Sequence, residues 1–155
     1  MVNKIAVAKT GNPYEGITAN ATESECEDLI QMIYWEAARC GCSLEVLEAT
    51  TQTVFNRMLS PDPYFPDTLG GVIRQKGQFV TVKKFYTEEI PDEVREVICD
   101  AVSEVVNGVM VLPDTNYLYF ATKRQSVAKD HIWIGKRHAD GSPYKGLGMY
   151  YGAPK

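Results

Sequence analysis

The sequence predicts an α+β fold in which helices come first and a small irregular β part occupies the C-terminal third. Apolar residues recur at steps of three and four over residues 24–40, 44–59 and 91–107, which is the spacing of one helix face. Two short runs rich in aromatic and β-branched residues, 117–120 and 132–134, indicate strands. Loops are expected around them because glycines interrupt the pattern: Gly135, Gly141, Gly146, Gly148 and Gly152.

The first helix, over residues 24–40, is expected to begin with a capping box, in which Ser24 and Glu27 satisfy free amide groups of the first turn. Gly41 ends the helix. One face carries its apolar residues, and we expect this face to pack in the core: Cys26, Leu29, Ile30, Ile33, Ala37 and Cys40.

The second helix, over residues 44–59, can be capped by Ser43. Because so short a connection separates it from the first helix, the two are expected to pack as a hairpin. Its inner side is predicted to consist of Leu44, Leu47, Thr51, Val54, Phe55 and Met58.

The segments that follow are predicted to be short. Residues 60–66 contain three prolines and form a rigid loop. Thr68 can cap a short helix that ends at Ile73. Residues 77–82 are expected to turn into a short strand.

The last helix, over residues 91–107, starts near Pro91 and closes at Gly108. We expect it to be the most buried helix and purely structural. A single apolar stripe supports this prediction: Val94, Val97, Ile98, Ala101, Val102 and Val105.

The length of 155 residues suits a single domain, which we assign to residues 23–155 after an irregular arm of residues 1–22. The chain is 45% hydrophobic and 23% charged, an ordinary balance for a globular protein. No apolar run reaches the roughly 20 residues of a membrane span. The N-terminus has too little apolar sequence for a secretory signal, so the export route stays open between a removed leader, phage-type release and another device.

The net charge of −4 conceals an uneven distribution. Residues 1–122 carry 9 Lys and Arg against 18 Asp and Glu, whereas residues 123–155 carry 7 against 2. A basic segment can attract a polyanion such as nucleic acid or an anionic cell-wall polymer. A solvated tail that balances an acidic body explains the same asymmetry. Since the whole chain is acidic and contains no nucleic-acid-binding motif, we predict no nucleic-acid partner.

The four cysteines are Cys26, Cys40, Cys42 and Cys99. Cys40 and Cys42 are too close in sequence for a zinc finger, and the only histidines, His131 and His138, are far away. We therefore predict neither a metal site nor a cofactor. Cys26 and Cys40 are interpreted as small core residues, and whether any cysteines pair is left open.

Glu36 is the most informative residue of the chain, because it lies inside the apolar face of the first helix. It follows Ile33 by three positions and Leu29 by seven. A carboxylate placed there loses water, which favours its neutral form. A proton retained near neutral pH is what a general acid needs. The alternative is a structural carboxylate bonded to the backbone or to an arginine such as Arg57.

Several short motifs resemble one known family. They are Ile33-Tyr34-x-Glu36-Ala37, Val54-x-Asn56-Arg57, Phe65-Pro66-x-Thr68-x-x-x-Val72-Ile73, Gly77-Gln78-Phe79, Leu118-Tyr119-Phe120 and Ile132-Trp133-Ile134. In this order and with similar gaps, they resemble the catalytic domain of bacterial cell-wall hydrolases of the spore-cortex-lytic-enzyme type (SleB/CwlJ-like).

This resemblance implies a compact lysozyme-like domain that cleaves the glycan strands of peptidoglycan and acts on the cell wall or the spore cortex. It also implies that Glu36 is the catalytic acid. Enzymes of this kind serve spore germination, phage lysis and mobile-element transfer, and the sequence does not choose among these processes.

The resemblance is compatible with two reactions. A lytic transglycosylase needs one carboxyl group and leaves 1,6-anhydro-muramic ends, which is the reading we favour. A muramidase or glucosaminidase would need a second carboxylate, for which Glu45 and Glu48 are the available residues, although both are expected to be solvated. A non-catalytic peptidoglycan-binding module and a scaffold protein with an incidental match are the remaining alternatives.

The substrate groove is expected to offer aromatic surfaces and amide groups to the sugars. Our candidates are Gln78, Phe79, Tyr119, Trp133 and Trp35. For Phe79 and Trp133 a place in the core is an equal alternative, and Trp35 is either a groove wall or packed beneath the C-terminal loops. Arg57 is expected to be structural and to bind backbone carbonyls. Glu36, Gln78 and Tyr119 should converge on one concave surface.

Overall fold

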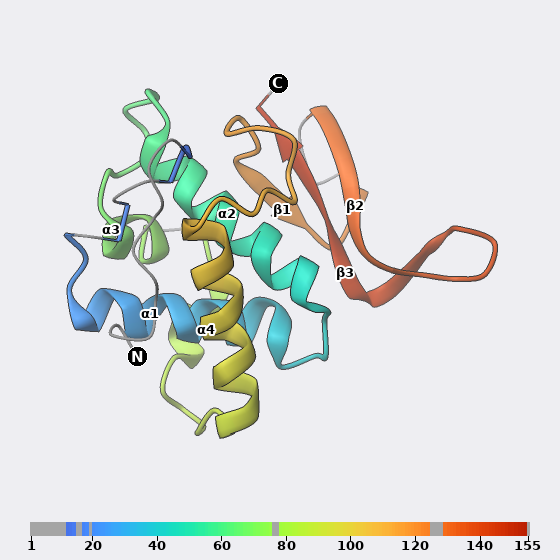
Figure 1. The fold of residues 1–155 in the computed structure, drawn as a ribbon, viewed down its shortest axis with the longest axis horizontal. Coiled ribbons are helices and arrows are strands. Elements are labelled where there is room, and N and C mark those ends of the chain that lie inside the picture. Colours follow the sequence, from blue (N-terminus) through green and yellow to red (C-terminus); the bar gives the residue numbers. More distant parts are fainter. Residues whose placement is uncertain (1–11, 15–16, 19, 76–77, 125–128, 155) are drawn as a thin grey trace.

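The order of the elements follows the α+β prediction, with helices first and strands last (Figure 1). This structure is a computed structural model, and it describes residues 12–14, 17–18, 20–75, 78–124 and 129–154. The helical elements are α1 (Glu23–Ile33), a π-helix (Tyr34–Ala38), α2 (Leu44–Leu59), α3 (Leu69–Ile73), a 3-10 helix (Val80–Lys84) and α4 (Asp92–Val106). The strands are β1 (Tyr119–Ala121), β2 (Lys129–Arg137) and β3 (Pro143–Ala153).

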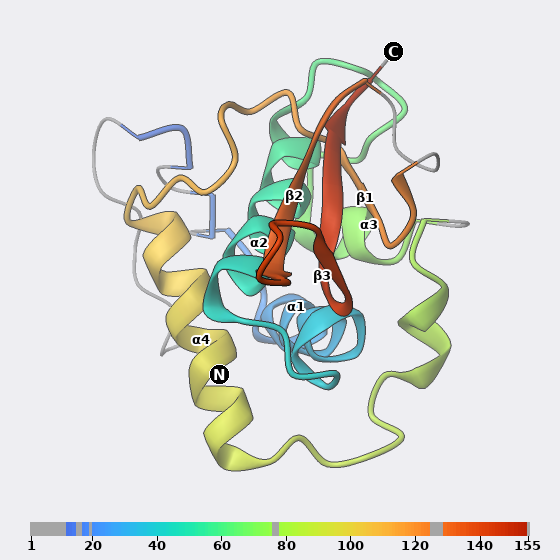
Figure 2. The same cartoon turned by 90° about the vertical axis from the view of Figure 1, so that its right-hand side faces the viewer.

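Helix α2 is the centre of the domain. It contacts α1, α3, α4, the π-helix and all three strands, and Figures 1 and 2 show it between the sheet and the other helices. Every residue from Val46 to Arg57 is buried. The prediction that the last helix is the most buried is therefore wrong, because α4 covers one side of α2 and leaves Val97 43% exposed.

Polar residues enter the core along α2 because each of them has a hydrogen-bond partner. The hydroxyls of Thr50, Thr51 and Thr53 donate to the carbonyls four residues earlier, at 2.8, 2.8 and 3.0 Å. These bonds remove the cost of burying a hydroxyl group. The apolar pattern predicted only one inner side for this helix, which included Thr51 but left out Thr50 and Thr53. One predicted inner residue, Leu44, is instead exposed.

Three further polar residues of α2, Gln52, Asn56 and Arg57, are buried and hold the backbone of residues 111–118. That segment lies outside the sheet, so side chains of α2 supply partners that a strand would otherwise provide. The amides of Val111 and Leu112 donate to Gln52 Oε1, Asn56 Nδ2 donates to the Tyr117 carbonyl, and Arg57 Nε donates to the Leu118 carbonyl, at 2.8, 2.8, 2.9 and 2.7 Å.

The N-terminal arm contributes a core residue, Tyr14, which is fully buried. Its hydroxyl donates to Asn56 Oδ1 at 2.7 Å and accepts from Gln52 Nε2 at 3.1 Å. Tyr14 therefore supplies further hydrogen-bond partners to Gln52 and Asn56, two of the buried polar side chains of α2.

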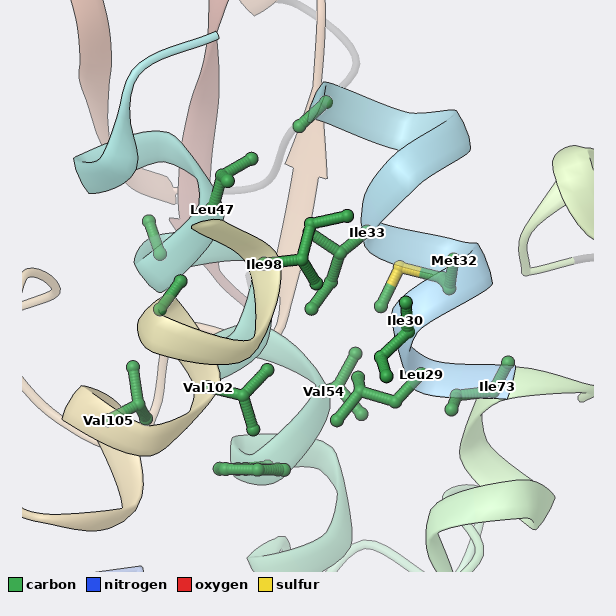
Figure 3. Packing of buried hydrophobic residues seen from close by; sticks show 14 of the residues in the cluster. Leu29, Ile30, Met32, Ile33, Leu47, Val54, Ile73, Ile98, Val102 and Val105 are labelled. Atoms are coloured by element: carbon green, nitrogen blue, oxygen red, sulfur yellow. The ribbon is translucent and has the colours of Figure 1, made fainter. Parts of the chain in front are cut away.

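The apolar core lies where α1, α2 and α4 meet (Figure 3). Leu29 and Ile33 of α1 pack with Val54 of α2 and with Ile98 and Val102 of α4, and all five side chains are fully buried. This confirms the predicted inner face of the first helix, with one exception described below for Cys40.

The ends of the helices agree with the sequence only in part. Gly41 ends the first helical segment in the left-handed region, with φ of 88°, and Thr68 caps α3 by accepting from the Gly71 amide at 3.1 Å. The capping box of α1, however, is formed by Thr22 and Glu25 instead of Ser24 and Glu27. Two possible capping boxes overlap here, each with a hydroxyl residue followed three positions later by a glutamate, and sequence spacing does not distinguish them.

The sheet contains a strand that the sequence analysis assigned to loops. Its order is β1-β3-β2, and both pairings are antiparallel. Gly135 and Gly148 face each other in register, and a Cβ atom on Gly135 would lie 2.4 Å from the Leu147 carbonyl oxygen. These glycines permit a close approach of β2 and β3 instead of interrupting a strand.

The predicted strand near residues 77–82 is also wrong within the described residues, where Val80–Lys84 is a 3-10 helix. Gly77 lies outside the described residues. The Val82 amide donates to the Phe79 carbonyl at 3.3 Å, and the Phe85 amide donates to the Val82 carbonyl at 3.1 Å. With these bonds the segment satisfies its own backbone and needs no strand partner.

In the part of the chain that the structure describes, no helix is long and apolar enough to cross a membrane. No group of three or more metal-binding side chains gathers there either.

Glu48 is buried in α2, 3% exposed, and not solvated as the sequence analysis expected. Burial raises its pKa from 4.5 to about 8, and a hydrogen bond with Glu104 of α4 adds to the shift. The neutral acid is the stable form there because an ionised Glu48 would lie unsolvated beside a second carboxyl group.

We expect Val102→Asp to lower the free energy of unfolding by about 4 kcal/mol, because it places an unpaired carboxylate in the core. Denaturant titration measures this loss. Val97→Asp is the matched control on the exposed side of the same helix and should change stability little. Equal effects of the two substitutions would contradict the assigned core.

Glu48 should make stability depend on pH. In the unfolded chain the carboxyl ionises near pH 4.5, whereas in the folded protein it keeps its proton up to about pH 8. Its contribution is therefore complete below pH 4.5 and is lost as the pH rises towards 8. Glu48→Gln should reduce the fall in unfolding free energy between pH 5 and 8, measured by urea titration. The same fall in both proteins would refute this assignment.

Candidate active site

Glu36 lies in a π-helix that directly continues α1. The wider turn is visible in its backbone bonds, since the Arg39 amide donates to the Tyr34 carbonyl five residues earlier, at 2.8 Å. A π turn accommodates one extra residue and rotates the side chains that follow it around the helix axis. This explains why Cys40 is exposed, although α-helical spacing places it on the apolar face. Single π turns of this kind frequently occur at functional sites.

Glu36 is partly buried and has one hydrogen-bond partner among the described side chains. Thr81 Oγ1 donates to Glu36 Oε1 at 2.9 Å. Burial raises the pKa of Glu36 above its ordinary value, while the Thr81 bond and the positive charge of Lys84 oppose this shift without cancelling it. The carboxyl group thus holds its proton to a higher pH than a free glutamate side chain does, and the alternative of a bond to Arg57 is not realised.

Thr81 is the site residue that sequence reasoning missed. It belongs to the 3-10 helix that was predicted as a strand, and it follows Phe79 by two positions. Its proximity to the Gly77-Gln78-Phe79 motif was the available signal. A hydroxyl group that reaches back to a residue 45 positions earlier leaves no pattern in the sequence.

The π-helix is fixed from outside by Glu88. Its carboxylate accepts a hydrogen bond from the Tyr34 hydroxyl, and it accepts two from the Arg39 guanidinium, at 3.0 and 3.2 Å. Tyr34 and Arg39 lie on either side of Glu36 in the sequence, so these contacts hold both ends of the segment that carries it.

Gln78 belongs to the same short segment of the chain as Thr81. Its side-chain oxygen accepts from Arg57 Nη1 at 3.0 Å, and its side-chain nitrogen donates to the Tyr64 hydroxyl at 2.8 Å. Gln78 precedes Thr81, the partner of Glu36, by three residues. Residues 78–81 therefore carry both the amide group of Gln78 and the hydroxyl group that binds Glu36.

Three aromatic rings surround the buried guanidinium group of Arg57. Its guanidinium carbon lies 5.2, 5.0 and 5.4 Å from the ring centroids of Phe65, Phe79 and Tyr119. Burial lowers its pKa to about 10, so it remains charged at neutral pH. Together with its bond to the Leu118 carbonyl, these contacts agree with the structural role expected for Arg57.

Of the aromatic candidates, Phe79 and Tyr119 are brought together at Arg57 but differ in exposure. Phe79 is buried, and its ring stacks on Phe120 with 5.8 Å between centroids. Tyr119 is only partly buried, at the edge of the sheet.

Trp133 lies apart from this cluster. It is opposite Tyr150 in the β2–β3 register, and its ring meets the Tyr150 ring at 5.0 Å. The next pair in the register, Ile132 and Tyr151, points to the other face of the sheet, where the Tyr151 hydroxyl lies 2.9 Å from Thr50 Oγ1 of α2. Trp133 is therefore on the face of the sheet that points away from α2.

Trp35 is beside Glu36 in the sequence and contacts cationic groups. Arg39 and Lys84 lie over its ring, at 5.0 and 5.6 Å from the ring centroid. Its indole nitrogen is buried without a hydrogen-bond partner in the structure. Lys84 thus lies close to the Trp35 ring, and its positive charge also lowers the pKa of Glu36.

The two possible partner carboxylates lie in different environments. Glu45 is exposed in the first turn of α2, and Glu48 is buried against Glu104 of α4. Among the described residues, neither forms a hydrogen bond with Glu36 or Thr81.

A comparison with known families gives one finding. A family model described as Cell Wall Hydrolase matches residues 45–142, which is more than half of the chain. The match runs from the first turn of α2 to the turn after β2, and it includes Thr81 and Gln78 but begins after Glu36. Searches of curated proteins and of solved structures gave no match.

We expect Thr81→Val to raise the pKa of Glu36 further, because the substitution removes the hydrogen bond that favours the ionised carboxylate. Titration of the Glu36 carboxyl carbon by NMR measures this directly. Thr87→Val is a suitable control, since Thr87 is exposed and donates to the Lys84 carbonyl instead of to a carboxylate. A lowered or unchanged pKa in Thr81→Val would show that the bond does not act on Glu36.

Proposed function

Because the chain belongs to the cell-wall hydrolase family, whose substrate is peptidoglycan, we propose that it cleaves the glycan strands of that polymer as a lytic transglycosylase with Glu36 as its catalytic acid. The observation that carries this proposal is a partly buried carboxyl group with a raised pKa, held in a π turn and bonded to one hydroxyl group.

The first step uses the proton of Glu36, whose pKa burial raises. In our proposal the acid donates it to the oxygen that bridges two sugars, and the bond to the muramic sugar breaks through an oxocarbenium-like state. Thr81 occupies Oε1, which leaves Oε2 to carry the proton. The Thr81 bond then stabilises the carboxylate that results, and the charge of Lys84 acts in the same sense.

The second step returns the proton to Glu36. The carboxylate takes the proton of the 6-hydroxyl group of the same muramic sugar, and the alkoxide oxygen closes a 1,6-anhydro ring at the anomeric carbon. Water takes no part in this step, so a second carboxylate is unnecessary. Glu48 has a pKa raised to about 8 by burial, which disfavours it as an ionised base or nucleophile and supports a mechanism with a single acid.

We assign substrate binding to the aromatic and amide side chains that the sequence analysis proposed for the groove. Gln78 would offer its amide group and Tyr119 its ring to the sugar chain, and the ring of Trp35 would form the wall beside Glu36. Phe79 would support Gln78 and Tyr119 from beneath, through Arg57. Trp133, on the outer face of the sheet, would contact a more distant part of the polymer.

Glu36→Gln should reduce peptidoglycan cleavage by roughly 10²- to 10⁴-fold, because the amide has the same shape but no transferable proton. Release of soluble glycan fragments from purified walls measures the rate. The variant should fold, since it removes a buried acid without changing the volume of the side chain. Glu93→Gln, in the exposed first turn of α4, serves as the control.

The products distinguish the two reactions. Fragments of the wild-type digest should be lighter by one water than hydrolysis products and should take up no label from isotopic water. Labelled reducing ends would replace the transglycosylase assignment with a hydrolase that uses a second carboxylate. Full activity of Glu36→Gln would remove Glu36 from catalysis, and binding without fragment release would indicate a non-catalytic peptidoglycan-binding module.

A further inference from the structure

The turn that follows the π-helix contains two thiols in contact. Cys40 Sγ and Cys42 Sγ lie 3.5 Å apart, with one residue between them. That residue, Gly41, has φ of 88°, a conformation that other residues adopt only under strain. Cys40 is exposed, whereas the two remaining cysteines, Cys26 and Cys99, are buried.

The same turn connects the candidate site with the sheet. The Cys42 amide donates to the Ala37 carbonyl at 3.3 Å, which closes the end of the π-helix. On its other side, Cys42 Sγ lies 3.9 Å from the Gly146 carbonyl of β3. A Cβ atom on Gly41 would lie 3.9 Å from Leu147 of the same strand. Figure 2 shows the β2–β3 hairpin in front of this connection between α1 and α2.

We propose that Cys40 and Cys42 are a redox pair whose disulfide clamps the end of the π-helix that carries Glu36. A disulfide needs about 2.05 Å between its sulfur atoms, a distance that small side-chain rotations across a flexible glycine turn can provide. The family acts on the cell wall, beyond the reducing systems that keep thiols reduced in the cytosol. The closed ring would fix Gly41 and, through it, the last turn of the π-helix.

The oxidant in this proposal is a small external disulfide, and the reaction is two successive exchanges. The Cys40 thiolate attacks the external disulfide and releases one thiol, which leaves Cys40 in a mixed disulfide. The Cys42 thiolate then attacks Cys40 Sγ, forms the ring and releases the second thiol. Two electrons and the two cysteine protons pass to the oxidant, which leaves as two thiols.

The environment of the pair sets this order. Burial raises the pKa of the Cys42 thiol to about 12, and Cys40 supplies the other two causes of the shift through a hydrogen bond and its charge. Both contributions of Cys40 disappear once it is in the mixed disulfide, which lowers the pKa of Cys42 from this value, while burial continues to raise it. The exposed Cys40 is accordingly the entry point for the oxidant.

Oxidised glutathione is the probe for the test, and the readout is intact mass with alkylation of free thiols. The folded wild-type protein should lose two hydrogen atoms, keep no glutathione, and lose the alkylation of Cys40 and Cys42. Cys42→Ser should instead retain one glutathione on Cys40, because no second thiol displaces it. Buried Cys26 and Cys99 should stay unmodified in both proteins.

Hydrogen exchange measures the proposed clamp without reference to activity. The amides of Arg39 and Cys42 donate to the π-helix carbonyls of Tyr34 and Ala37, so their exchange should slow by several-fold in the oxidised wild-type protein. It should not slow in Cys42→Ser treated in the same way. Accumulation of a glutathione adduct on the wild type, a wild type that stays reduced, or unchanged exchange after oxidation would each overturn the proposal. None of these results depends on whether Glu36 is catalytic.

Discussion

The hydrogen bonds from α2 to the backbone of residues 111–118 are the constraint on which the rest of the structure depends. Gln52, Asn56 and Arg57 lie on one side of this helix and are buried. Their bonds fix the segment that leads into β1, and therefore the edge of the sheet. A buried polar side chain that lost its partner would cost about 1–3 kcal/mol, so this row specifies one arrangement of the segment.

The same helix face determines where the candidate site is built. Arg57 is the last residue of the row, and it holds Gln78 through a hydrogen bond and the rings of Phe79 and Tyr119 through its charge. Gln78 and Phe79 precede the 3-10 helix, which in turn places Thr81 against Glu36. A structural arginine in the core thus connects the packing of α2 with the environment of the proposed acid.

Both helical segments at Glu36 depart from the α-helix. The π-helix supplies the acid and the 3-10 helix supplies its hydroxyl partner. Such segments have poorer backbone geometry than an α-helix and persist where other contacts hold them. Glu88 provides these contacts for Tyr34 and Arg39. The turn at Cys40 and Cys42 lies at the end of this segment, which is why a disulfide there would act on the site.

The sequence by itself determined most of the core-facing residues of α1 and α4 and the α+β order, and it singled out Glu36 as the candidate acid. These features follow from local periodicity, and the residues that express it, such as Leu29, Ile33 and Val102, are buried as predicted. Tertiary structure decided the central place of α2, the strand β3 and the contact of Thr81 with Glu36. The physical reason is the same in each case: buried threonines, facing glycines and a distant hydroxyl are stable only because of partners that lie far away in the sequence.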